Sequence, residues 1–213
     1  MKIAITGHTK GIGQEFARQL ANRGHEIIGI SRSDGENIRR IAHTASIIES
    51  CDMFINNAIS FYAQTELLFE VWHRWKDSNE KHYIWNISTK VCEWDRDKDI
   101  NGLTLRESME YRNQKMALEL AQQQLDAQHS NTKMTLIRPG SINTQLFSNP
   151  DAMPVDGRRL RQLVYKTPHQ PLTLAYAYNG AGRFTVKSPN GSCRIVPRHQ
   201  TSGAGGGAQN LHR

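Results

Sequence analysis

Two side chains that could exchange a proton, Tyr111 and Lys115, stand four residues apart in a stretch from 105 to 129 that predicts one long helix. Residues at this spacing share a helix face, so the lysine ammonium would favour the phenolate and lower the pKa of the tyrosine. A free tyrosine has a pKa of about 10 and is a poor base at neutral pH. The pair either works as a general acid and base or is an ordinary exposed pair on an amphipathic helix.

A glycine-rich segment, TGHTKGIG at residues 6–13, connects a predicted strand to a predicted helix. Gly7 allows a tight turn, Gly11 lets the backbone approach a pyrophosphate, and Gly13 permits close helix packing. The free N–H groups at the start of the helix would attract the anion. The segment therefore predicts dinucleotide binding, and the alternative is a loop whose glycines serve only the turn.

Two cations stand where the adenosine ribose would lie in such a fold. Lys10 precedes the second glycine of the motif, and Arg32 follows the second predicted strand. An NAD site usually has a carboxylate at the end of that strand, but here Ser31 holds the position and Asp34 comes too late in the turn. These residues favour a 2′-phosphate and hence NADP(H) over NAD(H).

The apolar periodicity alternates between strands and helices through residue 138, which predicts an α/β, Rossmann-like, doubly wound parallel sheet flanked by helices. After residue 149 the pattern becomes irregular, with a basic helix at 157–166 and a short strand at 183–187 as the only predicted elements. The predicted strands span residues 2–6, 26–30, 51–57, 83–88 and 134–138, and the predicted helices span 12–23, 38–50, 64–75 and 105–129.

Five motifs occur in the order found in the short-chain dehydrogenase/reductase family, which the sequence resembles over about residues 1–147. They are TGHTKGIG at 6–13, NNAI at 56–59, NIS at 86–88, YRNQK at 111–115 and RPGSINT at 138–144. Each motif alone is modest, whereas the ordered set is specific. The sequence is therefore identified as a shortened, divergent member of this family.

The resemblance implies a division of work among the motif residues. The hydroxyl groups of Ser88 and Tyr111 would hold the substrate oxygen, and Lys115 would bind the nicotinamide ribose. The hydride itself belongs to the nicotinamide, so the protein has to align the carbonyl carbon and stabilise charge on the oxygen. The implied cofactor-binding residues are Gly7, Thr9, Lys10, Gly11, Ile12, Gly13, Ser31, Arg32, Asn56, Asn57, Ala58, Tyr111, Lys115, Pro139, Gly140, Ile142 and Thr144.

The chain departs from the family pattern in several places. Only nineteen residues separate Arg32 from Asp52, which predicts that the usual third strand is missing and the sheet is narrower. Ile59 replaces the glycine that ends the NNAG motif. No asparagine stands at the helix position that supports a proton-relay water in the family, and Gln64 is the candidate substitute. The charged run at 94–99 either borders the substrate pocket or is a solvated loop.

Charge divides the chain into two parts. Residues 1–150 hold equal numbers of basic and acidic residues, whereas 151–213 hold nine Lys and Arg against two Asp, which accounts for the whole net charge of +7. We expect one dinucleotide-binding and catalytic domain at 1–150 and an atypical basic segment at 151–213, poorly ordered if it is foreign to the fold. Three scattered cysteines predict reduced thiols and no metal site, and the lack of a long apolar stretch predicts a cytoplasmic protein.

The sequence thus predicts an NADP-dependent oxidoreductase for a small carbonyl or alcohol, with no membrane partner and, by resemblance, a homodimer or homotetramer. One alternative is a protein that binds NADP(H) without turnover, because the substrate side is incomplete. Nucleic-acid binding through the basic tail, densest at Arg158, Arg159 and Arg161, is a weaker alternative because no recognised motif accompanies it. Sugar-nucleotide modification would need a larger C-terminal region.

Overall fold

The computed structural model describes residues 1–93, 100 and 102–140, together with five short strands farther along the chain. Those strands are β6 (Ile142–Asn143), β7 (Met153–Pro154), β8 (Ala175–Tyr178), β9 (Phe184–Lys187) and β10 (Cys193–Val196). β6 pairs with β7, and β8 to β10 form an antiparallel sheet in the order β10-β9-β8. The predicted strand at 183–187 corresponds to β9, while the predicted helix at 157–166 and the charged run at 94–99 lie outside the described residues.

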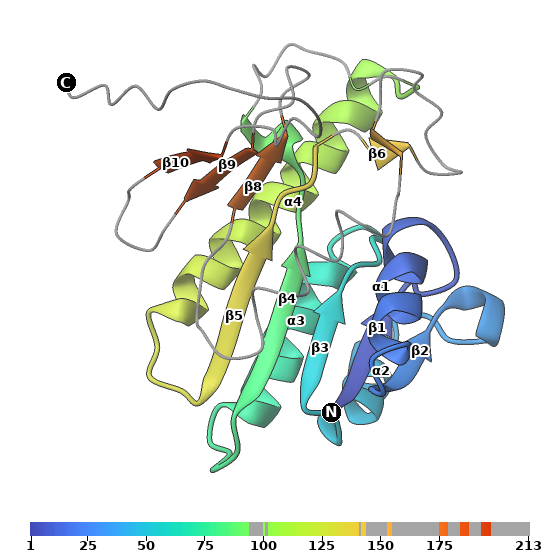
Figure 1. Ribbon diagram of the computed structural model, residues 1–213, viewed down its shortest axis with the longest axis vertical. Helices are drawn as coiled ribbons and strands as arrows, with labels where there is room; N and C mark the ends of the chain where they lie inside the picture. The colour runs from blue at the N-terminus through green and yellow to red at the C-terminus, as the bar shows by residue number, and fades with distance from the viewer. Residues whose placement is uncertain are drawn as a thin grey trace, which may run out of the picture.

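A parallel five-stranded sheet forms the centre of the molecule (Figure 1). Its strand order is β2-β1-β3-β4-β5. The chain therefore runs outward from β1 to β2 on one side of the sheet, and from β3 through β4 to β5 on the other. The strands are β1 (Lys2–Thr6), β2 (Glu26–Ile30), β3 (Met53–Asn56), β4 (His82–Ile87) and β5 (Thr132–Ile137). The sheet confirms the Rossmann-like class predicted from the sequence, and among the described residues it has no strand beyond β2, as the short spacing after Arg32 indicated.

Helices cover both faces of this sheet. Buried side chains of α1 (Gly11–Ala21) pack on one face, and those of α2 (Ile41–Glu49), α3 (Ala63–Trp75) and α4 (Leu105–Asp126) pack on the other. Short 3-10 turns follow β2 and β4, as η1 (Arg32–Asp34) and η2 (Lys90–Glu93). None of the described helices is long and apolar enough to cross a membrane.

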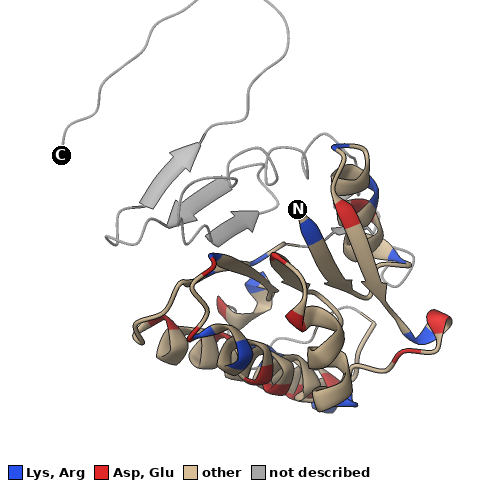
Figure 2. Ribbon diagram, turned by 90° about the horizontal axis from the view of Figure 1, so that it is seen from below, with Lys and Arg blue, Asp and Glu red and all other residues tan. Residues whose placement is uncertain are grey.

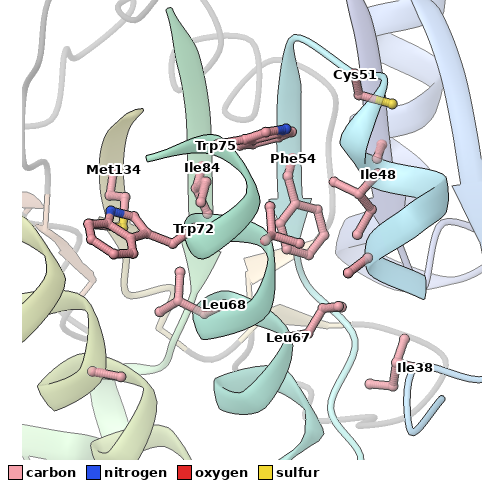
Figure 3. Close-up of a cluster of buried hydrophobic side chains, with 14 of the residues drawn as sticks. Ile38, Ile48, Cys51, Phe54, Leu67, Leu68, Trp72, Trp75, Ile84 and Met134 are labelled. Atoms are coloured by element: carbon pink, nitrogen blue, oxygen red, sulfur yellow. The ribbon is translucent and has the colours of Figure 1, made fainter. Parts of the chain in front are cut away.

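The larger core lies between the sheet and α2 to α4. Figure 3 shows Trp75 and Leu67 of α3 on the side of the strand residue Phe54, with Trp72 beside Met134 of β5 and Leu68 between them. Each of these side chains is buried, and burying one large apolar side chain stabilises a fold by about 1.5–3 kcal/mol. This packing fixes α3 and α4 against the strands whose ends carry the candidate site.

Local signals explain where α4 begins. Thr104 accepts a hydrogen bond from the backbone N–H of Glu107, and Glu107 accepts one from the N–H of Thr104, which makes a capping box. The observed start at Leu105 is therefore the predicted one. By contrast, α2 begins three residues later than predicted, because the carbonyl of Asn37 accepts hydrogen bonds from Arg40 and Thr44 and forms a turn first.

Charge is balanced over the described part of the chain. Figure 2 shows basic and acidic residues interspersed along the helices and at the strand ends of the described part of the chain. This distribution matches the equal counts in residues 1–150.

Candidate active site

The carboxyl ends of the five strands bring residues of four of the five sequence motifs, together with Ser31, to one edge of the sheet. Thr6 ends β1, Ser31 follows β2, Asn56 ends β3, Ser88 follows β4 and Arg138 follows β5. Because all five strands are parallel, these positions share the carboxyl edge, where open α/β sheets bind their ligands.

The glycine loop has the conformation that the motif predicts. Gly7 and Gly11 have φ values of 70° and 57°, which favour glycine. A Cβ on Gly13 would lie 2.3 Å from the carbonyl oxygen of Gly7, so only glycine lets α1 approach the loop this closely. The first turn of α1 has no acidic residue, and the Lys10 side chain makes no capping hydrogen bond. The donor set of this loop and helix start fits a pyrophosphate.

The end of β3 is bonded to the glycine loop. The hydroxyl oxygen of Thr6 accepts hydrogen bonds from the backbone N–H groups of Asn57 at 2.9 Å and Ala58 at 3.0 Å. The Asn57 side chain donates to the carbonyl of Thr6, and that of Asn56 donates to Asn86 on β4, both at 2.9 Å. The two asparagine side chains therefore hydrogen-bond to neighbouring strand ends. This agrees with a structural role for the NNAI motif at the turn after β3.

Three hydroxyl groups gather beside the end of β2. Thr9 Oγ1 lies 3.3 Å from Ser31 Oγ, Ser31 Oγ lies 2.5 Å from Ser33 Oγ, and Ser33 Oγ lies 3.2 Å from Thr9 Oγ1. Lys10 and Arg32, both exposed, are the chain neighbours of this triangle. The sequence argument named four of these five residues and missed Ser33, which only the turn of η1 brings back toward Thr9.

The one carboxylate of this turn is engaged elsewhere. Asp34 Oδ2 lies 3.3 Å from His8 Nε2. The His8 ring packs against Gly29 of β2, where a Cβ on Gly29 would lie 2.3 Å from the ring. Asp34 thus points toward the glycine loop rather than standing at the strand end. This arrangement agrees with the expectation that Asp34 does not take the place of the ribose-binding carboxylate.

Lys115 is buried beneath the carboxyl edge, with 3% of its surface exposed. Its Nζ donates to the carbonyl oxygen of Ile87 at 2.7 Å and to Oε1 of Gln64 at 2.9 Å. Burial disfavours the ammonium and lowers the pKa of Lys115 to about 8, although Cys92 and Glu119 oppose the shift. The Nζ atom lies 5.8 Å from the centre of the Tyr111 ring, so the two side chains do share a helix face.

The expected lowering of the Tyr111 pKa is wrong. Burial of the phenol raises its pKa, and a side-chain hydrogen bond from Thr89 opposes this effect without reversing it. Lys115 directs its hydrogen bonds to Gln64 and Ile87 rather than to the phenol. The protonated phenol is therefore the favoured form of Tyr111 at neutral pH.

Ser88 and Thr89 have different partners. Ser88 Oγ donates to the carboxylate of Glu119 on α4, and Arg138 Nε donates to the same carboxylate at 2.8 Å. Thr89 hydrogen-bonds to Tyr111. Glu119, Arg138 and Thr89 were missed by the sequence argument, although an adjacent Ser-Thr pair at a strand end was a signal that two hydroxyls compete for one role.

The segment after β5 is described only in part. The carbonyl of Pro139 accepts a hydrogen bond from the N–H of Lys90 at 3.0 Å, which joins this segment to the loop after β4. Gly140 follows at the same edge, Ile142 begins β6, and Thr144 lies outside the described residues. Within the described part of the chain, no three or more His, Cys, Asp or Glu side chains form a metal-binding group.

No family model matches the sequence. A stretch of 80 residues is 31% identical to 11-beta-hydroxysteroid dehydrogenase B of Sesamum indicum. It covers 31% of this chain and 22% of that relative, so the match spans about a fifth of the relative's length.

Solved structures resemble the whole fold more broadly. A short-chain dehydrogenase from Streptomyces avermitilis has a TM-score of 0.57 and 19% identity, over 84% of this chain and 89% of that one. A 4-hydroxyisoleucine dehydrogenase complexed with NADH has a TM-score of 0.57 and 16% identity, over 78% and 90% of the two chains. A short-chain dehydrogenase from Sphingobium yanoikuyae in complex with NADPH has a TM-score of 0.55 and 18% identity, over 76% and 82%.

The parallel sheet with a glycine loop at its carboxyl edge defines a Rossmann-like α/β class of protein. Within that class, the fold is that of the short-chain dehydrogenases/reductases, as the five ordered motifs implied.

Proposed function

We propose that this protein is an NADP(H)-dependent oxidoreductase of the short-chain dehydrogenase/reductase type that interconverts a small carbonyl compound and its alcohol. The observation that carries the proposal is the common placement of the glycine loop and the Tyr111–Lys115 pair at the carboxyl edge of one sheet. When bound, the nicotinamide supplies or accepts the hydride. The named neighbours in complex with NADH and NADPH support a nicotinamide cofactor.

The preference for NADP(H) is supported by the groups around the end of β2. The hydroxyls of Thr9, Ser31 and Ser33 are close enough to bond one phosphate together, and Lys10 and Arg32 add positive charge beside them. Hydrogen bonds to charged groups contribute about 1.5–3 kcal/mol each. The cluster would therefore bind a 2′-phosphate much more strongly than a bare 2′-hydroxyl.

In the proposed reaction, Tyr111 exchanges a proton with the substrate oxygen, assisted by Lys115 and Ser88. The raised pKa of Tyr111 keeps its phenol protonated at neutral pH, which suits donation to a carbonyl oxygen as the hydride reaches the carbon. Without ligand, Tyr111 is therefore in the protonation state that the reducing step needs near pH 7. The reverse reaction requires the phenolate and becomes easier at high pH.

A fluorescence titration with NADPH and NADH tests the cofactor proposal. NADPH should bind more tightly than NADH. Lys10→Ala and Arg32→Ala should each lower the affinity for NADPH by about tenfold or more and change the affinity for NADH little. Lys81→Ala is a matched control, because this exposed lysine precedes β4 at the opposite edge of the sheet. An equal loss of affinity for NADPH and NADH in these variants would contradict 2′-phosphate recognition. Failure of the wild-type protein to bind either nucleotide would reject the proposed function.

A second candidate is a protein that binds NADP(H) without turnover. It is favoured by the partners of Ser88 and Lys115, since Glu119 accepts from the serine while Gln64 and Ile87 accept from the lysine. NADPH binding without oxidation in the presence of a broad panel of aldehydes and ketones would support this candidate. Oxidation that is lost in Tyr111→Phe would exclude it.

A further inference from the structure

A histidine of the glycine loop is packed against the strand at the edge of the sheet. The ring of His8 lies so close to Gly29 of β2 that a Cβ on Gly29 would be 2.3 Å from both Cε1 and Nε2. A glycine inside a strand often marks a close approach of this kind. The missing side chain of Gly29 therefore provides the space in which the His8 ring lies.

The pattern of β2 defines the face of the sheet on which this ring lies. Side chains alternate along a strand, and Ile27 packs with the core beneath α1, whereas Ile28 and Ile30 pack with the core on the other face. Gly29 shares the face of Ile27. The His8 ring therefore lies on the α1 side of β2, two residues before the strand end at Ser31.

The polar contact of the ring is with the carboxylate of Asp34. His8 Nε2 lies 3.3 Å from Asp34 Oδ2. The other ring nitrogen, Nδ1, is buried and has no hydrogen-bond partner within the part of the chain that the structure describes. A ring proton on Nε2 has Asp34 as its acceptor, whereas a proton on Nδ1 would have none there. Because a hydrogen bond to a carboxylate is about twice as strong as a neutral one, this contact holds the Asp34 side chain against the ring.

Asp34 lies in the same turn as part of the hydroxyl cluster, which comprises Thr9, Ser31 and Ser33. The backbone N–H of Asp34 donates to the carbonyl of Ser31 at 3.0 Å, so η1 holds the aspartate one 3-10 turn after the strand end. Hydroxyl donors that can bond a phosphate can bond a carboxylate as well. A free carboxylate on this turn would therefore compete with a 2′-phosphate for the cluster, at a high effective concentration.

We propose that His8 is a positioning residue that sets the nucleotide preference. By holding the Asp34 carboxylate against its ring, His8 keeps the hydroxyl cluster open for a 2′-phosphate. Without His8, the carboxylate would bond to the cluster, repel a 2′-phosphate and accept hydrogen bonds from the free ribose hydroxyls of NADH. The inference rests on the proposed NADP(H)-dependent function and concerns which of the two nucleotides the site prefers.

Fluorescence titration of the full chain with NADPH and NADH tests this role. In His8→Ala the affinity for NADPH should fall by about tenfold, while the affinity for NADH stays the same or rises. The ratio of the two affinities is the decisive readout, because a general disturbance of the glycine loop would weaken both nucleotides alike. His25→Ala is the matched control, since this histidine precedes β2 at the opposite edge of the sheet and should leave the ratio unchanged.

Further variants test whether His8 acts through Asp34. Adding Asp34→Asn to His8→Ala removes the competing charge and should restore most of the affinity for NADPH, and Asp34→Asn alone should bind NADPH at least as tightly as the wild-type protein. Gly29→Ala places a methyl group in the space of the ring and should lower the ratio in the same direction, although His8 is still present. Thermal unfolding of each variant shows whether the fold is kept.

Three results would overturn the inference. The first is an equal loss of affinity for both nucleotides in His8→Ala, and the second is a loss of NADPH affinity that Asp34→Asn does not relieve. The third is a wild-type protein that binds NADPH and NADH equally well, which would leave nicotinamide binding itself intact. Failure of the wild-type protein to bind either nucleotide would instead reject the proposed function, and the role of His8 with it.

Discussion

The amide of Gln64 connects the start of α3 to the buried lysine of α4, because its Oε1 accepts a hydrogen bond from Lys115 Nζ at 2.9 Å. Its Nε2 donates to the carbonyl oxygens of Asn56 at 2.7 Å and Ile87 at 3.1 Å. Both amide donors are thus used at strand ends, which leaves the amide oxygen for the lysine. Gln64 therefore sets where the ammonium of Lys115 lies.

Replacing Gln64 with leucine should destabilise the protein and release Lys115. The variant removes the Gln64 donor from the carbonyls of Asn56 and Ile87, of which Ile87 keeps its bond from Lys115, and it leaves one ammonium proton of Lys115 without its acceptor. The free energy of unfolding should therefore fall by about 2–4 kcal/mol. Urea denaturation measures this loss. Gln124→Leu, at an exposed position of α4, is the matched control and should change the stability by less than about 0.5 kcal/mol. Equal effects of the two substitutions would show that Gln64 contributes only helix propensity.

The buried ammonium of Lys115 should make stability depend on pH in a defined window. Its pKa is about 8 in the folded protein and 10.5 in the unfolded chain, so the unfolded state binds more protons between these values. Stability must therefore rise with pH from about 8 to 10.5, by up to roughly 3 kcal/mol at 1.36 kcal/mol per pKa unit. Below pH 8 both states are protonated and this dependence disappears.

Lys115→Met isolates this dependence, because methionine fills similar space without a charge. The difference in unfolding free energy between the wild-type protein and Lys115→Met should change steadily over the window above pH 8 and stay constant from pH 6 to about 7. Chemical denaturation at a series of pH values checks this. A flat difference up to pH 10 would mean that the folded pKa of Lys115 is not lowered.

An apolar stripe on α4 offers a contact surface for the homodimer or homotetramer that the family resemblance implies. Leu105, Met109, Met116 and Leu120 are each at least 40% exposed and lie within about 60° of one another around the helix axis. We expect sedimentation velocity to give a mass above that of one chain and Leu120→Glu to lower it. Asn22→Glu, which adds the same charge at the end of α1, should leave the mass unchanged. A single-chain mass for the unaltered protein would contradict the expectation.

The sequence was sufficient for features that depend on local pattern. The bounds of β1 and β2 were predicted to the residue, because Lys2–Thr6 and Glu26–Ile30 are short apolar runs ended by turn residues. The start of α4 at Leu105 was also predicted from its apolar periodicity, and the structure adds the capping box of Thr104 and Glu107 as its local cause. The narrow sheet followed from chain length alone, since nineteen residues cannot hold another helix and strand.

Features that depend on which atom is nearest could not be predicted. The sequence placed Tyr111 and Lys115 on one helix face. The direction in which the tyrosine pKa shifts, however, depends on how deeply the phenol is buried and on which acceptors take the hydrogen bonds of Lys115. The partner of Ser88 depends on how the chain leaves β4 and on the position of Glu119, thirty-one residues later. Spacing along the chain carries neither kind of information.

The glycine loop supplies the sharpest test of the nucleotide site. A Cβ on Gly13 would lie 2.3 Å from the Gly7 carbonyl oxygen and 2.6 Å from Asn57 Nδ2, and Asn57 is itself held by Thr6. Gly13→Ala must therefore push the loop away from α1, and NADPH affinity should fall by at least about tenfold as its backbone donors are displaced.

Gly24 provides the control for that substitution, because it stops α1 with a φ of 80° and a Cβ there would meet nothing within 4 Å. Gly24→Asn should bind NADPH as the wild-type protein does, since asparagine tolerates this backbone conformation. Fluorescence titration and thermal unfolding of both variants separate a local change in the loop from a general loss of stability. If Gly13→Ala binds NADPH with unchanged affinity, the loop between β1 and α1 is not the phosphate site and the nucleotide must bind elsewhere.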